Sequence, residues 1–180
     1  VYDDVRATDA AFRKRWLLHS VLEPRIADDR FVVAMPPQPD LKRDGGELEG
    51  HVLLPRRALL NPIGGPGLEY YVDGRNYDDG GKLAERLARR EKSPTRPEPG
   101  AWRIELSPET DSLEDQFLVV LVVGAYGASR PHRVRRIERG GQVGAEVIGP
   151  ARTTRWWFTP GQPAVQVEVG ANTHQLRARS

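Results

Sequence analysis

The 180-residue chain contains no cysteine. It can therefore form neither a disulfide nor a zinc–thiolate site, and thiolate catalysis is excluded. Long apolar runs are also absent, because the longest covers only residues 117–123 and a membrane-spanning helix needs roughly 20 residues. We expect no membrane span, whereas the lack of cysteine alone leaves the compartment open.

Lysine is scarce, because only Lys14, Lys42, Lys82 and Lys92 are lysines among 27 basic residues. With 25 acidic residues the net charge is only +2. Arginine suits carboxylate, sulfate and phosphate groups, but a high arginine content also follows from a GC-rich genome. The densest basic run, residues 130–139, predicts either a face that binds a sulfated or carboxylated chain or an edge strand protected from aggregation by its charge.

Alternation of apolar and polar residues is the main pattern of the chain. It is clear at 102–106 and 165–169, whereas residues 117–123 are apolar on both faces, as in a central strand covered on each side. Turns rich in Gly and Pro separate short segments. This pattern predicts an all-β fold, an antiparallel β-sandwich of two stacked sheets with one short helix and long loops. We expect a single domain over residues 1–180, with the helix at 79–91 and a proline-rich loop at 93–100.

Several short motifs follow one another in the first 124 residues. They are Phe12-Arg13-Lys14-Arg15-Trp16-Leu17-Leu18-His19-Ser20 with Glu23-Pro24, Gly46-Glu47-Leu48 with Leu53-Leu54-Pro55, Gly64-Gly65-Pro66-Gly67-Leu68-Glu69-Tyr70, Asp73-Gly74-Arg75-Asn76-Tyr77, Gly100-Ala101-Trp102-Arg103-Ile104-Glu105-Leu106-Ser107-Pro108 and Asp115-Gln116-Phe117-Leu118-Val119-Val120-Leu121. Their order, more than any single motif, resembles heparinase II/III-like polysaccharide lyases.

The resemblance implies that the chain is the C-terminal accessory β-sandwich of a bacterial lyase that cleaves uronate-containing, acidic polysaccharides by β-elimination. In that family an α/α-toroid domain precedes the sandwich and carries the catalytic tyrosine and histidines and the metal site, in motifs such as His-x-His-x-Asp and His-Asn-Thr. Neither motif occurs in this chain. We therefore expect no catalytic residue, no metal and no cofactor in this chain, and no activity from it alone.

The parent protein is expected in the periplasm or outside the cell, with the toroid domain as the partner of this chain. The chain opens at Val1 without an initiator methionine, which favours a fragment of that larger protein.

The four histidines, His19, His51, His132 and His174, are scattered and show no metal-ligand spacing. His19 is the best individual candidate, because it ends the first motif. Alternation places Leu17 and His19 on one face of a strand and Trp16 and Leu18 on the other. There, His19 either hydrogen-bonds across strands or lines the cleft beside the toroid domain.

Residues 64–67 either cradle an anion with their backbone amides or, as we expect, form a positive-φ turn between strands. They lack the strand, helix and lysine context of a P-loop, so no nucleotide site is expected. The aromatic and polar residues after it either pack locally or border a glycan groove. Trp156 and Trp157 are adjacent, so one of them faces away from the core and offers a sugar platform unless sheet packing covers both. The candidate carbohydrate-binding residues are therefore His19, Tyr70, Arg75, Asn76, Tyr77 and Trp156.

An autonomous carbohydrate-binding β-sandwich is the alternative function. The chain lacks the interleaved aromatic and basic pattern of an RNA-binding sheet, so we expect no nucleic-acid partner.

Overall fold

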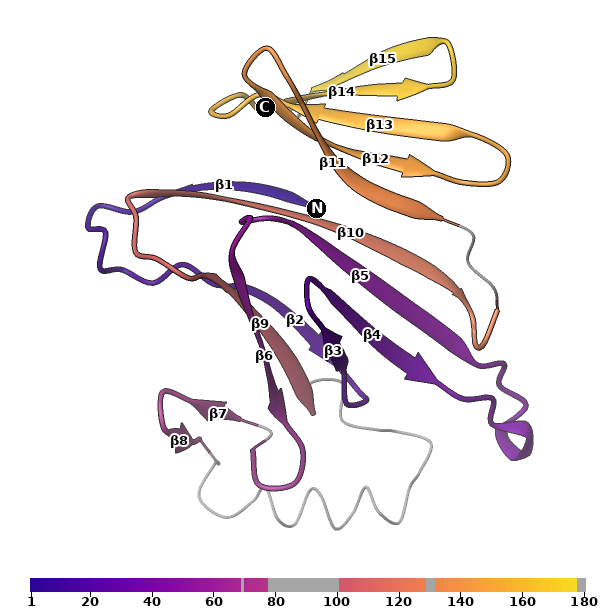
Figure 1. Ribbon diagram of the computed structural model, residues 1–180. Coiled ribbons are helices and arrows are strands. Elements are labelled where there is room, and N and C mark those ends of the chain that lie inside the picture. Colours follow the sequence, from indigo (N-terminus) through magenta and orange to yellow (C-terminus); the bar gives the residue numbers. More distant parts are fainter. Residues whose placement is uncertain (69, 78–100, 129–131, 178–180) are drawn as a thin grey trace.

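The structure, a computed structural model, describes residues 1–68, 70–77, 101–128 and 132–177. Within these residues nearly all regular structure is antiparallel β, and three sheets are stacked (Figure 1). The middle sheet has the order β1 (Tyr2–Arg6), β10 (Glu114–Ala125), β5 (Gly46–Leu54), β4 (Arg30–Met35) and β3 (Arg25–Ala27). The three-stranded sheet on one side has the order β2 (Trp16–Ser20), β9 (Trp102–Pro108) and β6 (Ala58–Gly64).

The C-terminal sheet covers the other side of the middle sheet. It pairs consecutive strands in chain order: β11 (Arg133–Arg139), β12 (Gln142–Ile148), β13 (Thr153–Phe158), β14 (Ala164–Val169) and β15 (Asn172–Arg177). Glycines in the left-handed region make its tight turns, as at Gly140 (φ 50°) and Gly141 (φ 78°). Two smaller elements complete the described chain, the hairpin β7 (Tyr71–Val72) and β8 (Arg75–Asn76) and the 3₁₀ helix η1 (Pro39–Leu41).

Strand β10 holds the layers together, because both of its faces are apolar. Phe117 and Val119 enter a core shared with the three-stranded sheet, whereas Leu118 and Val120 pack in a core shared with the C-terminal sheet. Val119 is fully buried and Leu118 is 2% exposed. A strand buried on both faces belongs in the middle of a stack, so the prediction from residues 117–123 is confirmed for 117–121. Val123, near the end of the same apolar run, is 77% exposed.

The core against the three-stranded sheet is the more deeply buried of the two. Phe31, Ile104 and Leu106 are fully buried in it. The ring of Phe31 in β4 lies across Gly50 of β5, where an added Cβ would stand 2.0 Å from Cζ of the ring. Glycine at position 50 therefore allows the largest core side chain of β4 to cross its neighbouring strand.

The core against the C-terminal sheet joins the first strand of the chain to the last layer. Leu54 and Leu118 meet Val143 and Ala145 there. The rings of Tyr2 in β1 and Phe158 in β13 stack with centroids 4.4 Å apart and planes inclined by 15°. The two sheets are thus joined by aromatic as well as aliphatic packing.

The prediction of an all-β antiparallel sandwich is confirmed, and the structure adds a third layer to the two expected. The helix expected at 79–91 and the proline-rich loop at 93–100 lie outside the described residues. Across the described ranges, no helix has the length and apolar character that a membrane crossing requires.

Candidate functional site

Three of the sequence motifs meet on the outer face of the three-stranded sheet. In β2, Trp16 and Leu18 pack toward the core while Leu17 and His19 are exposed, as alternation predicts. The register places His19 beside Arg103 of β9 and Leu17 beside Glu105. We call this surface, together with hairpin β7–β8 and the loop before β2, the hairpin face.

A ladder of alternating charges crosses the hairpin face. Nε and Nη2 of Arg103 each lie 2.8 Å from Oε1 of Glu105. Arg15 follows, with Nε 3.7 Å from Oε2 of Glu105 and Nη1 3.5 Å from Oδ1 of Asp73. The Arg103 and Glu105 side chains are only 10% and 13% exposed, so this pair fixes the floor of the face, whereas Asp73 is 74% exposed.

The glycine loop directs hairpin β7–β8 over this face. Gly65 has φ 84°, and its backbone N–H donates to the carbonyl of Ala101 at 3.0 Å. An added Cβ at Gly65 would lie 2.9 Å from the ring of Trp102. The predicted positive-φ turn is therefore confirmed, and its close approach to Trp102 lets the hairpin that follows reach Arg15 through Asp73.

The predicted site residues of the hairpin fall into two groups, those that close the hairpin and those that are exposed to solvent. Oδ1 of Asn76 accepts a hydrogen bond from the backbone N–H of Tyr70 at 2.9 Å, and the N–H of Tyr77 donates to the carbonyl of Tyr70 at 3.0 Å. These contacts close the hairpin. The guanidinium carbon of Arg75 lies 4.9 Å from the ring centroid of Tyr77, which is 54% exposed. Arg75 and Tyr77 thus form a cation–π pair that is open to solvent.

The loop before β2 is anchored by Lys14, whose Nζ lies 3.0 Å from Oδ2 of Asp115 and donates to the carbonyl of Ser112. The Lys14 and Asp115 side chains are 8% and 11% exposed. The anchor leaves the nearby ring of Phe12 60% exposed beside a cavity of about 480 Å³. Residues from the loop and the sheet line this cavity, among them Phe12, Arg13, Arg15, Asn61, Glu105 and Ser107.

Sequence reasoning did not select Phe12, Arg15, Asn61 or Glu105. The sequence feature that could have pointed to Phe12 and Arg15 is the run of polar and aromatic residues immediately before β2, inside the first motif. Glu105 and Arg103 were expected on the wet face of β9, and they do lie on its outer face, but their mutual pairing keeps both largely buried.

Trp156 lies in another part of the molecule. It is half-buried among the residues that pack between the middle and C-terminal sheets. Trp157 is the tryptophan that faces away from this core, yet it is only 6% exposed, because the Arg139 guanidinium stacks 4.0 Å above its ring. The structure therefore brings five of the predicted residues to the hairpin face or its hairpin and leaves Trp156 apart.

The four histidines lie in or beside four different strands. His19 is exposed on β2, His51 lies buried in β5, His132 directly precedes β11, and His174 lies in β15. Nε2 of His51 is 3.2 Å from Oε1 of Glu49, yet burial lowers the pKa of His51 below its ordinary value. Within the described ranges, no three His, Asp or Glu residues are grouped as metal ligands would be.

The hairpin face offers guanidinium donors, an amide, exposed rings and a polar cavity. These groups suit a hydroxyl-rich ligand that carries carboxylates. No protein-family model matches the chain, and no curated protein matches it. The resemblance to heparinase II/III-like lyases therefore stays a prediction from the order of the motifs.

Proposed function

We propose that the chain is an accessory β-sandwich that holds an acidic polysaccharide on its hairpin face for a heparinase II/III-like lyase. The observation that carries this proposal is that three segments of the motif series come together on one face. The motif that ends at Ser20, the segment 64–77 and strand β9 are far apart in the sequence, yet Arg15 contacts both Glu105 and Asp73 on a single face. Sequence segments that resemble one family in order thus assemble one continuous surface.

The chemistry of this surface fits a chain of uronates. The exposed rings of Phe12 and Tyr77 can stack on the apolar faces of sugars, while Arg75 supplies a forked donor for a carboxylate. Arg13, Lys14 and Arg15 line the cavity together with Glu105, Glu109, Asp111 and Asp115, so the cavity itself carries no excess of positive charge. The preference for acidic over neutral polysaccharides rests on the exposed guanidinium of Arg75 beside Tyr77.

Substrate binding and acid–base chemistry are assigned to different domains. β-Elimination from a uronate requires neutralisation of its carboxylate, a base for the adjacent proton and an acid for the leaving oxygen. The hairpin face supplies binding and orientation through its arginines. The base and acid come from an α/α-toroid domain of the same protein, with His19 on the sandwich side of the cleft. Such a protein acts on its polymer in the periplasm or outside the cell.

Titration with uronate oligosaccharides tests the binding surface. We expect Tyr77→Ala and Phe12→Ala each to weaken binding about fivefold to tenfold, since an exposed stacking contact contributes about 1 kcal/mol. Tyr126→Ala is the matched control, because Tyr126 is also exposed (45%) but follows β10 on the middle sheet. If both hairpin-face variants bind as tightly as Tyr126→Ala, this surface does not hold the glycan.

The alternative is an autonomous carbohydrate-binding module. It is favoured by the fact that the exposed rings and the cavity all belong to this one chain. A module predicts tight binding by the purified chain alone, whereas an accessory domain predicts weak binding that rises when the toroid is present. Both predict no unsaturated-uronate absorbance from the purified chain with heparan or alginate, so robust turnover would contradict both.

A further inference from the structure

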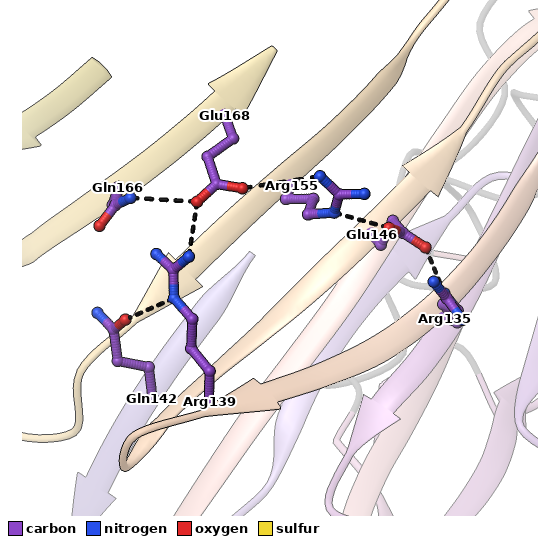
Figure 2. Close-up of polar contacts among 7 residues, drawn as sticks. All are labelled: Arg135, Arg139, Gln142, Glu146, Arg155, Gln166 and Glu168. Atoms are coloured by element: carbon purple, nitrogen blue, oxygen red, sulfur yellow. Dashed lines mark hydrogen bonds and ion pairs between the residues drawn. The ribbon is translucent and has the colours of Figure 1, made fainter. Parts of the chain in front are cut away.

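The outer face of the C-terminal sheet carries a second cluster of charged residues (Figure 2). The register aligns Arg135 of β11 with Glu146 of β12, Glu146 with Arg155 of β13, and Arg155 with Glu168 of β14. The residues that face the core, Val143 and Ala145 among them, alternate with these, so the charged row lies on the side away from the middle sheet. We call this surface the C-terminal face.

Each carboxylate in the row is shared between two arginines. Nε of Arg155 lies 2.7 Å from Oε1 of Glu146, and Nε of Arg135 donates to Oε2 of the same group. Nη1 of Arg139 lies 2.8 Å from Oε1 of Glu168, whose Oε2 is 3.8 Å from Nη1 of Arg155. The pattern fixes the arginines in a line that crosses the sheet.

The negative groups are covered and the positive groups are exposed. The side chains of Glu146 and Glu168 are 2% and 16% exposed, whereas those of Arg135, Arg139 and Arg155 are 65%, 42% and 40% exposed. Hydrogen bonding from Arg135, against the opposing effect of burial, lowers the pKa of Glu146. Glu146 therefore stays ionised at neutral pH and holds its two arginines in place.

The arginines retain donors for a ligand. Arg135 contacts Glu146 through Nε, so within the described residues its two Nη nitrogens remain as donors. Arg133 lies on the same side of β11 and is exposed, and no acidic residue of the described chain pairs with it. Among the described side chains of the C-terminal face, the four arginines Arg133, Arg135, Arg139 and Arg155 stand against two glutamates, which leaves a net charge of +2.

Neutral hydrogen-bonding side chains surround these charges. Nε of Arg139 donates to Oε1 of Gln142 at 3.2 Å, and Nε2 of Gln166 donates to Oε1 of Glu168 at 3.2 Å. Amides among guanidinium groups suit a ligand that carries hydroxyls as well as anionic groups. The one aromatic residue of the described row, Trp157, is buried beneath Arg139, so no ring is open for base stacking.

We propose that the C-terminal face is a second binding site for acidic polysaccharide, which docks its carboxylate or sulfate groups on Arg133, Arg135 and Arg155. The ligand class rests on the proposed function, but the site is separate from the hairpin face, since the middle sheet lies between the two outer sheets. Two separated sites would hold one long chain at two points and raise its residence on the protein. The buried ring and the surrounding amides favour a glycan over a nucleic acid.

Charge reversal at Arg133 tests this site without breaking the ion-pair row. We expect Arg133→Glu to weaken binding of polygalacturonate or heparin oligosaccharides about tenfold, because a charge-assisted contact is replaced by repulsion. Arg43→Glu is the matched control, since Arg43 is exposed in the loop after η1 and the net-charge change is identical. The polyuronate and sulfated arms show which anionic group is preferred, and dextran is the neutral reference.

The outcomes separate the two sites. Loss in Arg133→Glu but not in Arg43→Glu supports the C-terminal face. Equal losses in both variants, no loss in either, or equally tight binding of a DNA duplex would overturn it. If Tyr77→Ala alone weakens binding, the hairpin face stands and this second site falls. If Arg133→Glu alone weakens it, the hairpin face falls and this site stands.

Discussion

Replacing Arg103 by alanine tests whether the charged floor of the hairpin face is structural. Arg103 makes two contacts of 2.8 Å with Glu105, and the two side chains are 10% and 13% exposed. Without Arg103, the Glu105 carboxylate stays largely buried, and Arg15, at 3.7 Å, is the one basic partner left to it among the described residues. Breaking a buried ion pair costs about 3–5 kcal/mol, and the remaining arginine reduces this, so we expect Arg103→Ala to lower the free energy of unfolding by about 2–3 kcal/mol.

The chain contains a matched control for burial. Arg6 and Glu114 form a cross-strand pair of the same residue types, with Nε 3.5 Å from Oε1, but their side chains are 77% and 66% exposed. Water replaces such a contact readily, so Arg6→Ala should cost less than about 0.5 kcal/mol. Replacing both charges, as Arg103→Met with Glu105→Gln, should recover most of the loss, because no unpaired charge is then left buried.

Equilibrium urea unfolding measures all of these variants. The unfolding midpoint should fall in Arg103→Ala with an unchanged m-value, since the extent of the folded structure is the same. If Arg103→Ala and Arg6→Ala differ by less than about 0.5 kcal/mol, burial does not decide the strength of these pairs. The Arg103–Glu105 pair would then not fix the floor of the hairpin face.

Three further predictions concern the layers and pH. Leu118→Ala should destabilise the chain by about 3 kcal/mol, against less than about 0.5 for the 77% exposed Val123 of the same strand, and urea unfolding checks both. Gly50→Ala should lower the melting temperature sharply, because the added Cβ would meet the ring of Phe31, whereas Gly67→Ala, with open space around it, should show only the smaller cost of its positive φ. Burial lowers the pKa of His51 from 6.5, so as the pH falls His51 is protonated in the unfolded state before it is protonated in the folded state. The free energy of unfolding should therefore be highest above pH 6.5 and should decrease as the pH falls below 6.5. His51→Gln should flatten this dependence in unfolding curves recorded between about pH 8 and pH 5, and an unchanged slope would rule out His51 as its source.

The sequence was sufficient to predict a strand where the residues on both of its faces are apolar. Residues 117–123 are apolar throughout, and β10 is buried on both sides from Phe117 to Leu121. Strand β6 was not among the predicted strands, and Pro62 within it is a residue that argues against a strand. The structure resolves this by placing β6 at an edge of its sheet, where a missing N–H is tolerated.

Which sheet covers which face could not be predicted from alternation alone. Alternation places Trp156 and Trp157 on opposite faces of the strand. It does not predict that the middle sheet covers Trp156 and that the side chain of Arg139 covers Trp157. Arg103 alternates like a solvent-facing residue, and its burial depends on partners in β9 and in the loop before β2. Pairing between distant segments is set by the tertiary fold, so these parts of the site required coordinates.

Mapping the bound oligosaccharide by NMR chemical-shift perturbation tests the hairpin face most directly. A short uronate oligomer should shift the amide and side-chain signals of Leu17, His19, Asn61, Arg75 and Tyr77 together, whether or not the C-terminal face also responds. Saturable binding that leaves all five signals unmoved would contradict the account.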